Sequence, residues 1–266
     1  MFRRSAPSSA PPRAPWPWAV AGLGLGALAT LLLCAPAHWL AAGVARASGG
    51  QVLLQQARGT VWNGSAQLVL TGGADSRDHT ALPGRLHWRL RPAWTGAQAQ
   101  LSADCCTPAP LHLRATPGWG RLHLAVADGD SRWPAAVLSG LGTPWNTVQP
   151  QGRLQLGTQG LALEWSAGRM RLQGQVRLDA LDMSSRLSTL RPMGSYRLQL
   201  AGGEAPTLQL STLDGALLLS GSGQWVGQRL RFTGEASAAP GREAALANLL
   251  NIIGRRSGAR SVITVG

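Results

Sequence analysis

The residues of this chain that could do chemistry are few. His112 and His123 alternate with leucines in two short segments, so a hairpin joining these segments places both imidazoles on its polar face. There they could face each other and bind a metal ion, although solvated cross-strand histidines are the interpretation we favour. Asp128-Gly-Asp130 resembles the start of a calcium-binding loop but lacks the downstream glutamate, and we interpret it as a turn.

The cysteines and the glycines point to no active site either. Cys34 lies in an apolar segment, and Cys105 is followed directly by Cys106, so no long-range disulfide framework and no metal-ligand spacing can be inferred. The sequence also lacks a Gly-x-Ser-x-Gly elbow, a phosphate-binding loop and a dinucleotide fingerprint. We therefore predict no catalytic residue, no metal site and no cofactor, and a protein that is not an enzyme.

The charge of the chain is strongly positive. The 266 residues include 25 basic and 12 acidic ones, for a net charge of +13, and every basic residue is arginine. The arginines recur singly within alternating segments such as 85–91, whereas nucleic-acid binders gather Lys and Arg on one face with aromatic residues between them. This pattern argues against a nucleic-acid partner and suits anionic lipid headgroups or acidic proteins, whose attraction weakens as salt rises.

The N-terminal part has the features of a membrane anchor. Residues 1–15 combine Arg, Pro, Ser and Ala, which predicts a disordered cytoplasmic tail. Residues 16–40 contain no charged side chain, and we predict a transmembrane helix there. Three arginines precede this segment and only Arg46 follows it closely, so the positive-inside tendency places the rest of the chain in the periplasm, anchored once in the cell inner membrane. The alternative is cleavage by signal peptidase at Ala35-Pro-Ala37.

The remainder predicts a mainly β protein. Residues 41–50 form a linker, with a short helix over 41–47 that Gly49 and Gly50 end, and residues 51–266 form a periplasmic antiparallel, curved β-sheet in meander order. Alternation and turn residues predict strands at 51–57, 60–71, 85–91, 97–103, 111–116, 119–127, 152–157, 160–166, 169–178, 195–201, 206–211, 214–220 and 228–236.

Few segments favour a helix. A short helix is expected over 131–140, residues 178–190 are ambiguous, and the leucine spacing over 242–253 predicts a C-terminal helix. A last strand follows it and is a candidate edge for a partner's strand: Ser261, Val262, Ile263, Thr264 and Val265.

One stretch, residues 59–68, organises this pattern. Asn63-Gly64 between apolar residues predicts a tight hairpin with Gly64 at positive φ, and Trp62 is expected to pack beside the turn. The same device, a tryptophan followed by a glycine turn and a strand, recurs at 94–96, 165–168 and 225–227. In each copy the tryptophan is expected to bury its ring beside the turn and to fix the register.

Several ordered blocks together are similar to a known family. They are Gly59-Thr-Val-Trp62-Asn-Gly64-Ser-Ala66, the stretch 82–92 around Trp88, the stretch 213–234 around Trp225, and 246–256 around Gly254. In this order, behind one N-terminal anchor, they resemble type II secretion system protein N over residues 16–266. The resemblance implies a non-catalytic, inner-membrane accessory component that faces the periplasm, contacts other type II secretion subunits and helps to export folded exoproteins. Its motif residues are Gly59, Trp62, Gly64, Trp88, Trp225 and Gly254.

A second class stays open. Amphipathic antiparallel sheets behind a single N-terminal span are also the build of envelope proteins similar to the AsmA family, whose curved sheets hold acyl chains on the apolar face. The inner face distinguishes the two classes. A secretion component should fill its concavity with its own side chains, whereas a lipid carrier should leave an open apolar groove.

Overall fold

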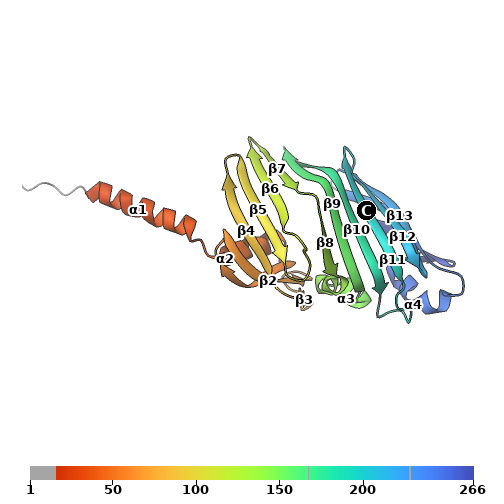
Figure 1. Cartoon of the computed structure of the whole chain (residues 1–266). Coiled ribbons are helices and arrows are strands. Elements are labelled where there is room, and N and C mark those ends of the chain that lie inside the picture. The colour runs from red at the N-terminus through yellow and green to blue at the C-terminus, as the bar shows by residue number, and fades with distance from the viewer. Residues whose placement is uncertain (1–15, 167, 228) are drawn as a thin grey trace, which may run out of the picture. The chain divides into compact units, whose positions relative to one another are not determined.

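A computed structural model of the chain describes residues 16–166, 168–227 and 229–266 (Figure 1). The predicted disordered tail over 1–15 lies outside these residues. The chain divides into two compact units, of which the second runs from Pro36 to Gly266. We predict the start of the β-rich domain at residue 51, and α2 (Ala37–Ala47), with Pro36 before it, belongs to the same compact unit as the sheet.

The first unit contains one helix, α1 (Trp16–Leu33), which is apolar throughout. The single helix predicted over 16–40 is wrong in extent, since α1 ends at Leu33 and a new helix begins at Ala37. Pro36 is the physical reason: proline disfavours helical backbone at the residue before it, and Pro36 itself is extended, with φ −72° and ψ 147°. Within the described residues, we find no helix that has both the length and the apolar character to cross a membrane.

The second unit opens with α2 (Ala37–Ala47), in the region predicted as a linker. This helix lies against the first strand, and its buried residue Ala37 joins Ala66 and Trp88 in one apolar cluster. Because α2 carries part of the core, the segment is a structural element of the β unit. Pro36 adds an antiparallel bridge to Thr60.

A single antiparallel sheet forms the rest of this unit, and in the described residues it has 16 strands. In chain order they are β1 (Val52–Gly59), β2 (Asn63–Thr71), β3 (His79–Ala81), β4 (Leu86–Ala93), β5 (Gly96–Ala103), β6 (Leu111–Gly118), β7 (Arg121–Val126), β8 (Gly129–Pro134), β9 (Gln151–Ser166), β10 (Arg169–Ser184), β11 (Gly194–Gly203), β12 (Thr207–Gly215), β13 (Leu217–Val226), β14 (Arg229–Ala238), β15 (Arg255–Ser257) and β16 (Arg260–Val265). The order across the sheet is β1-β2-β4-β5-β6-β7-β9-β10-β11-β12-β13-β14-β16-β15, with β3 on β2 and β8 on β9. The predicted antiparallel meander is confirmed.

Several local predictions differ from the structure. The helix expected over 131–140 is replaced by β8 and a 3-10 helix, η1 (Ala135–Leu141), and the ambiguous segment 178–190 begins as the continuation of β10. The two strands predicted at 152–157 and 160–166 form one strand, β9, because a bulge absorbs Gly160 and Gly174. A Cβ on Gly174 would lie 2.2 Å from the Gly160 oxygen, so only glycine fits there.

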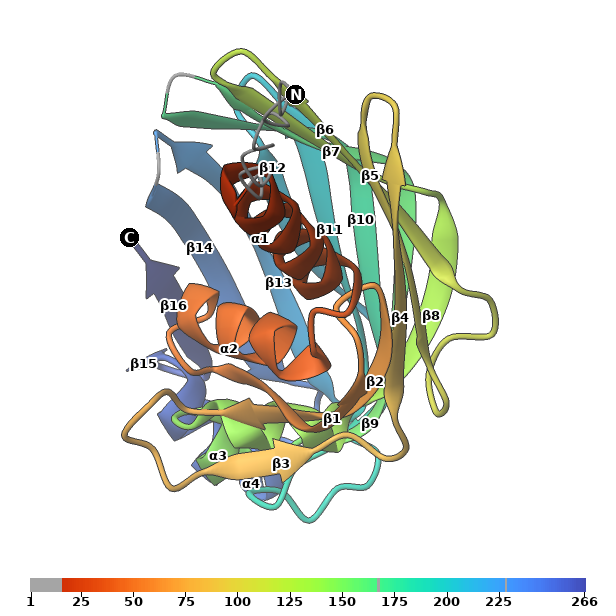
Figure 2. The ribbon, with the colours of Figure 1, turned by 90° about the vertical axis from the view of Figure 1, so that its left-hand side faces the viewer.

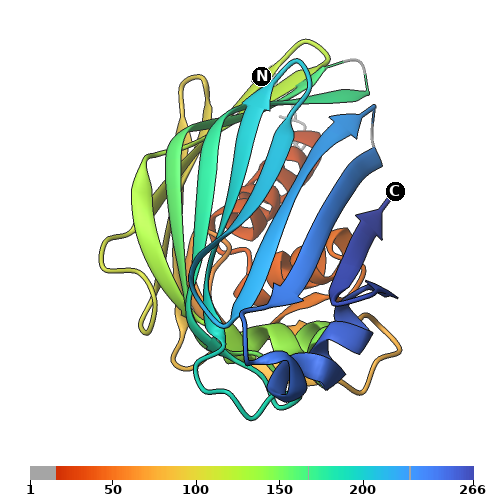
Figure 3. The ribbon, with the colours of Figure 1, turned by 90° about the vertical axis from the view of Figure 1, so that its right-hand side faces the viewer.

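The sheet is strongly curved, and its two faces differ in polarity (Figures 2 and 3). Leucines pair in register across neighbouring strands, as in Leu178 with Leu198 and Leu198 with Leu210. The intervening positions are polar, as in Arg177 with Gln199. The apolar face is the concave one, since it carries Trp88 and the cluster that α2 covers. One side of the sheet is thus apolar from β2 to β16.

Besides α2, which covers the cluster around Ala66 and Trp88, three helices lie at one end of the strands. They are η1, α3 (Trp145–Val148) and α4 (Glu243–Ile253), and the C-terminal helix predicted over 242–253 is confirmed. Leu246, Leu249 and Leu250 of α4 are buried in a cluster with Tyr196 and Leu217 of the sheet. Val137 of η1 packs in a separate cluster with Leu82 and Cys106. The core is therefore three local clusters beneath helices.

Candidate functional site

The organising stretch forms a hairpin whose turn is not the predicted one. Asn63 and Gly64 lie inside β2, Gly64 pairs with Gly59, and residues 60–62 make the turn. The positive φ, 87°, belongs to Gly59. The prediction of a two-residue Asn-Gly turn is wrong because a three-residue turn closed by Gly59 leaves Asn63 and Gly64 free to pair.

Trp88 explains why residue 64 is glycine. A Cβ on Gly64 would lie 2.5 Å from Cζ2 and 2.8 Å from Cε2 of Trp88, a residue that is 3% exposed, so the indole occupies the space of a side chain at this position. The Trp88 indole Nε1 donates hydrogen bonds to the carbonyl oxygens of Thr60 (3.2 Å) and Val61 (3.0 Å). The Trp62 carbonyl in turn accepts from the backbone N–H of Leu90 at 2.6 Å. The contact between the β1–β2 hairpin and β4 thus brings together four of the family-motif residues: Gly59, Trp62, Gly64 and Trp88.

The other tryptophan turns are real, but their rings are not buried. The predicted turns at 94–96, 165–168 and 225–227 link β4 to β5, β9 to β10, and β13 to β14. The Trp94 side chain is fully exposed, Trp165 is 46% exposed, and Trp225 is half-buried. The expected packing of the ring beside the turn is therefore wrong for Trp94 and Trp165, because no described helix of the second unit packs on these turns.

The C-terminal strand is paired on both sides over part of its length. Ser261 and Val262 pair with both β14 and β15, and the Ser261 hydroxyl donates to the Leu250 carbonyl at 2.6 Å. Gly254 precedes β15, and a Cβ there would lie 2.5 Å from the Val262 oxygen. Among the described residues, Ile263, Thr264 and Val265 pair with β14 alone, so this half of the candidate edge faces outward.

The candidate metal-binding residues do not converge. His123 pairs with Thr116 across the β6–β7 hairpin, while His112 lies further along, where its carbonyl accepts from the Ala127 N–H at 2.8 Å. The Asp128 carboxylate accepts a hydrogen bond from the Gly160 N–H at 2.6 Å and so holds the bulge of β9. Asp128 lies at the bend between β7 and β8, while Gly129 begins β8 and Asp130 pairs with Gly157, so only the first residue of Asp128-Gly-Asp130 lies outside a strand.

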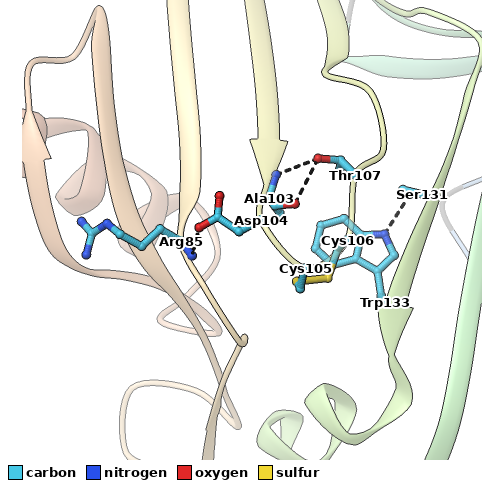
Figure 4. Close-up of a disulfide and its surroundings, with 8 residues drawn as sticks. All are labelled: Arg85, Ala103, Asp104, Cys105, Cys106, Thr107, Ser131 and Trp133. Atoms are coloured by element: carbon cyan, nitrogen blue, oxygen red, sulfur yellow. Dashed lines mark hydrogen bonds between the residues drawn. A yellow bond between two sulfur atoms is a disulfide. The ribbon is translucent and has the colours of Figure 1, made fainter.

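The two neighbouring cysteines form a disulfide in the loop between β5 and β6 (Figure 4). Cys106 is buried against Leu82, Ala103 and Val137, and Cys105 is exposed. The loop is held independently, since the Asp104 carboxylate accepts from the Arg85 N–H at 3.0 Å and the Thr107 hydroxyl accepts from the Ala103 N–H at 2.8 Å. The disulfide joins adjacent residues and ties no distant segments together.

A buried carboxylate organises the polar face. Asp179 on β10 accepts two hydrogen bonds from the Arg197 guanidinium on β11, at 2.7 and 2.8 Å. This pairing, with a smaller contribution from Arg177, lowers the pKa of the Asp179 carboxyl despite its burial. On the opposite face, burial raises the pKa of the Tyr196 hydroxyl well above its ordinary value.

The concave face is partly uncovered. Several leucines of the middle strands are half-buried and belong to none of the three clusters that the described helices of the second unit cover: Leu124, Leu163, Leu172, Leu198 and Leu208. A sheet face of this composition in water exposes apolar area that a ligand or partner can cover. The sequence had predicted the alternation of these residues, but not which of them helices would cover.

Sequence reasoning missed a second surface, made by the turns opposite the helices. Trp94 and Trp119 extend fully into solvent there, and Trp165, Met170, Leu122 and Val226 are all more than one-third exposed. The sequence does show tryptophans at or just before glycine turns, and this pattern predicts rings packed beside the turns. It does not show that these turns lie at the same end of the sheet, because that depends on the order of the strands.

Comparison with known proteins supports the family. The family described as type II secretion system (T2SS), protein N matches residues 50–264, which is nearly the whole sheet with α4. Searches of curated proteins and of solved structures give no match. The match begins two residues before β1 and ends one residue before the end of β16, so it covers the β unit that carries the motif residues. The chain belongs to the type II secretion system protein N family.

Proposed function

We propose that the chain is an inner-membrane-anchored, periplasm-facing accessory component of the type II secretion system, with a non-catalytic binding and scaffolding role in the export of folded exoproteins. The family match over residues 50–264 carries this proposal. The uncharged segment 16–40 behind an arginine-bearing tail supports the anchor and its orientation. Other secretion subunits are the proposed partners, and the proposal needs no cofactor and no nucleic acid.

The test is secretion by a deletion strain. We expect loss of the gene to lower the amount of type II exoproteins in the medium and to leave them folded in the periplasm. An alkaline phosphatase fused after Gly266 should be active, and N-terminal sequencing should find no chain that begins at His38. Wild-type secretion in the deletion strain would contradict the secretion role, and a chain that begins at His38 would contradict the anchor.

The outward half of β16 is the proposed contact for a partner's strand. Its backbone N–H and C=O groups from Ile263 to Val265 have one neighbour, β14, among the residues described. A photoreactive benzoyl-phenylalanine at the exposed Thr264 should cross-link to a secretion subunit in cells. The matched control is Ser222, which is also exposed but lies on β13, between β12 and β14. Equal cross-linking at both positions would exclude the edge as the contact.

The half-buried leucines of the concave face favour a second candidate function, the handling of lipids. The described helices of the second unit leave the middle of the concave face uncovered, and bound acyl chains would remove this apolar area from water. Lipid extraction of the purified chain, followed by mass spectrometry, should then find bound phospholipid. A deletion strain with normal secretion and altered envelope lipids would favour this function over the first.

A further inference from the structure

The meander gathers alternate turns at one end of the sheet. The turn at 60–62, those at 94–95 and 119–120, and the links from β9 to β10, β11 to β12 and β13 to β14 all lie at the end opposite α3 and α4. Figure 2 shows the β4–β5, β6–β7 and β11–β12 hairpin tips toward the top of the view, with β3, α3 and α4 at the bottom, and Figure 3 shows the same strands from the other side. We call the end that carries these hairpin turns the tip end, and the end that carries α3 and α4 the helix end.

The tip end exposes large apolar side chains. Trp94 and Trp119 have relative exposures of 107% and 103%, so neither ring contacts the rest of the protein to any extent. Met170 (54%) and Trp165 (46%) lie at the start of β10 and near the end of β9. Tryptophan has an apolar body and a polar N–H, which suits it to the boundary between lipid headgroups and acyl chains. Fold stability does not explain these exposed rings.

Arginines accompany the apolar residues at the tip end. Exposed guanidinium groups occur within a few residues of the turns, on the polar face of the strands: Arg91, Arg121, Arg169, Arg171, Arg229 and Arg231. Three of them, Arg121, Arg169 and Arg171, line an open notch of about 330 Å³ together with Glu164 and Ser166. None of these three is joined to a carboxylate by an ion pair in the part of the chain that the structure describes. The notch can therefore receive an anionic group such as a phosphate.

The acidic residues are distributed unequally between the two ends. Near the tip turns the carboxylates are Glu164 and Glu204. The loops and strand ends of the helix end carry a larger set: Asp75, Asp78, Asp104, Asp182, Asp214 and Glu243. The tip end is thus net positive, whereas charge at the helix end is mixed. An anionic surface would be attracted to the first and not to the second.

The chain also enters the β unit at the tip end. Pro36, its first residue, bridges to Thr60 in the tip-end turn 60–62. The uncharged segment 16–35 directly precedes it in the sequence. Whatever surface that apolar segment associates with is therefore joined to the tip end by a short connection.

We propose that the tip end docks on the surface of a bilayer rich in anionic phospholipid, with Trp94 and Trp119 among the headgroups and Arg121, Arg169 and Arg171 on lipid phosphates. This goes beyond the secretion role, since it assigns a surface and a lipid class. It also orients the β unit: the strands rise from the membrane, and the helix end and its acidic loops face away from it.

Site-specific cross-linking to lipid tests the proposal. The full chain is reconstituted in vesicles of phosphatidylglycerol and phosphatidylcholine, with benzoyl-phenylalanine in place of Trp94, Trp119 or Ala109. Ala109 is the control, because it is exposed in the β5–β6 loop at the helix end. We expect phospholipid adducts by mass spectrometry at Trp94 and Trp119 and none at Ala109. Equal adducts at all three positions, no adduct at the tips, or adducts to a second copy of the chain would overturn the proposal.

The arginines are tested by a matched pair of triple variants. Changing Arg121, Arg169 and Arg171 to Gln should lower the adduct yield at Trp119 in phosphatidylglycerol vesicles about tenfold and leave the yield in pure phosphatidylcholine unchanged. The control changes Arg186, Arg191 and Arg242 to Gln, which removes the same charge from exposed sites at the helix end. Thermal melting confirms that each variant is folded. Equal losses in the two triple variants would overturn the proposal.

The lipid cross-linking experiment and the deletion-strain experiment can fail independently. Normal secretion in the deletion strain together with adducts at the tips would contradict the secretion role alone. Impaired secretion without tip adducts would contradict membrane docking alone.

Discussion

Gly64 and Trp88 show how one residue position can be constrained for a reason invisible in the local sequence. Gly64 pairs with Trp88 across β2 and β4, and the ring occupies the space of a side chain at position 64. The Asn-Gly pair correctly marked the position as special. It could not show that the constraint comes from an aromatic ring twenty-four residues later (88 − 64 = 24).

We expect Gly64→Ala to lower the free energy of unfolding by roughly 1–3 kcal/mol, because the added methyl overlaps the Trp88 ring. In a Trp88→Leu background the penalty should shrink, since the overlapping ring is gone. Gly227→Ala is the control: it has φ 65° and open space around it, so its cost should not depend on residue 88. Denaturant unfolding measures the cost of Gly64→Ala and of Gly227→Ala, each with Trp88 and with Leu at position 88. Strict additivity of Gly64→Ala and Trp88→Leu would show that the ring is not the cause.

Asp179 makes stability depend on acid pH. The Arg197 hydrogen bonds lower its pKa in the folded state, so the carboxylate stabilises the fold above the unfolded pKa of about 3.9. This contribution is lost as pH falls through the folded pKa. We expect Asp179→Asn to cost roughly 1.5–3 kcal/mol at neutral pH and progressively less than that below about pH 4. Asp182→Asn removes an exposed partner of Arg153 and should cost less than about 1 kcal/mol. A pH-independent difference for Asp179→Asn would refute the assignment.

At the scale of elements, α4 is part of the core. Leu249 is 2% exposed beneath the sheet, whereas Ile252 on the same helix is 48% exposed. We expect Leu249→Ala to destabilise the protein by roughly 2–5 kcal/mol through the cavity it leaves. Ile252→Ala should change stability by less than about 0.5 kcal/mol. Equal effects in urea unfolding would mean that α4 does not pack as described.

The sequence predicted the type of an element correctly where one face of the strand or helix is buried and the opposite face is exposed to solvent. Alternation correctly indicated β4, β6 and β7, and the spacing of leucines indicated α4. The failures have physical causes as well. Residues 131–134 form β8 because β9 offers a long unpaired edge beyond β7, which is a tertiary effect that overrides local preference. The bulge at Gly160 and Gly174 broke the period of β9 and made one strand look like two.

For the whole molecule, the division after Ala35 predicts an autonomous β unit. Its three buried clusters lie entirely within residues 36–266. We expect a protein of residues 36–266 to fold and to melt at the same temperature as the full chain, measured by circular dichroism. Loss of the cooperative transition in the shorter protein would show that the N-terminal segment contributes to the fold.

The candidate surfaces could be recognised only from the arrangement of the whole sheet. The sequence identified Trp94 and the arginines singly, and it predicted a cationic protein suited to anionic lipid or acidic partners. It could not place the turns of Trp94 and Trp119 at the same end of the sheet or separate arginines from carboxylates along the strands. Those relations follow from which turns share an end, and the number and order of the strands decide this.

The order of the strands also bears on how the protein is made. Nearly every strand pairs with the one that precedes it in the chain, so most contacts are local in sequence. A chain that emerges from its N-terminus onward can therefore add each new hairpin to an edge already formed, without waiting for its last residues. Three strands do not pair with the strand before them: β4 pairs with β2, β8 pairs with β9, and β15 lies outside β16, directly after α4. The sheet can thus assemble while the chain is still emerging, and its last two strands complete the edge when the C-terminus becomes available.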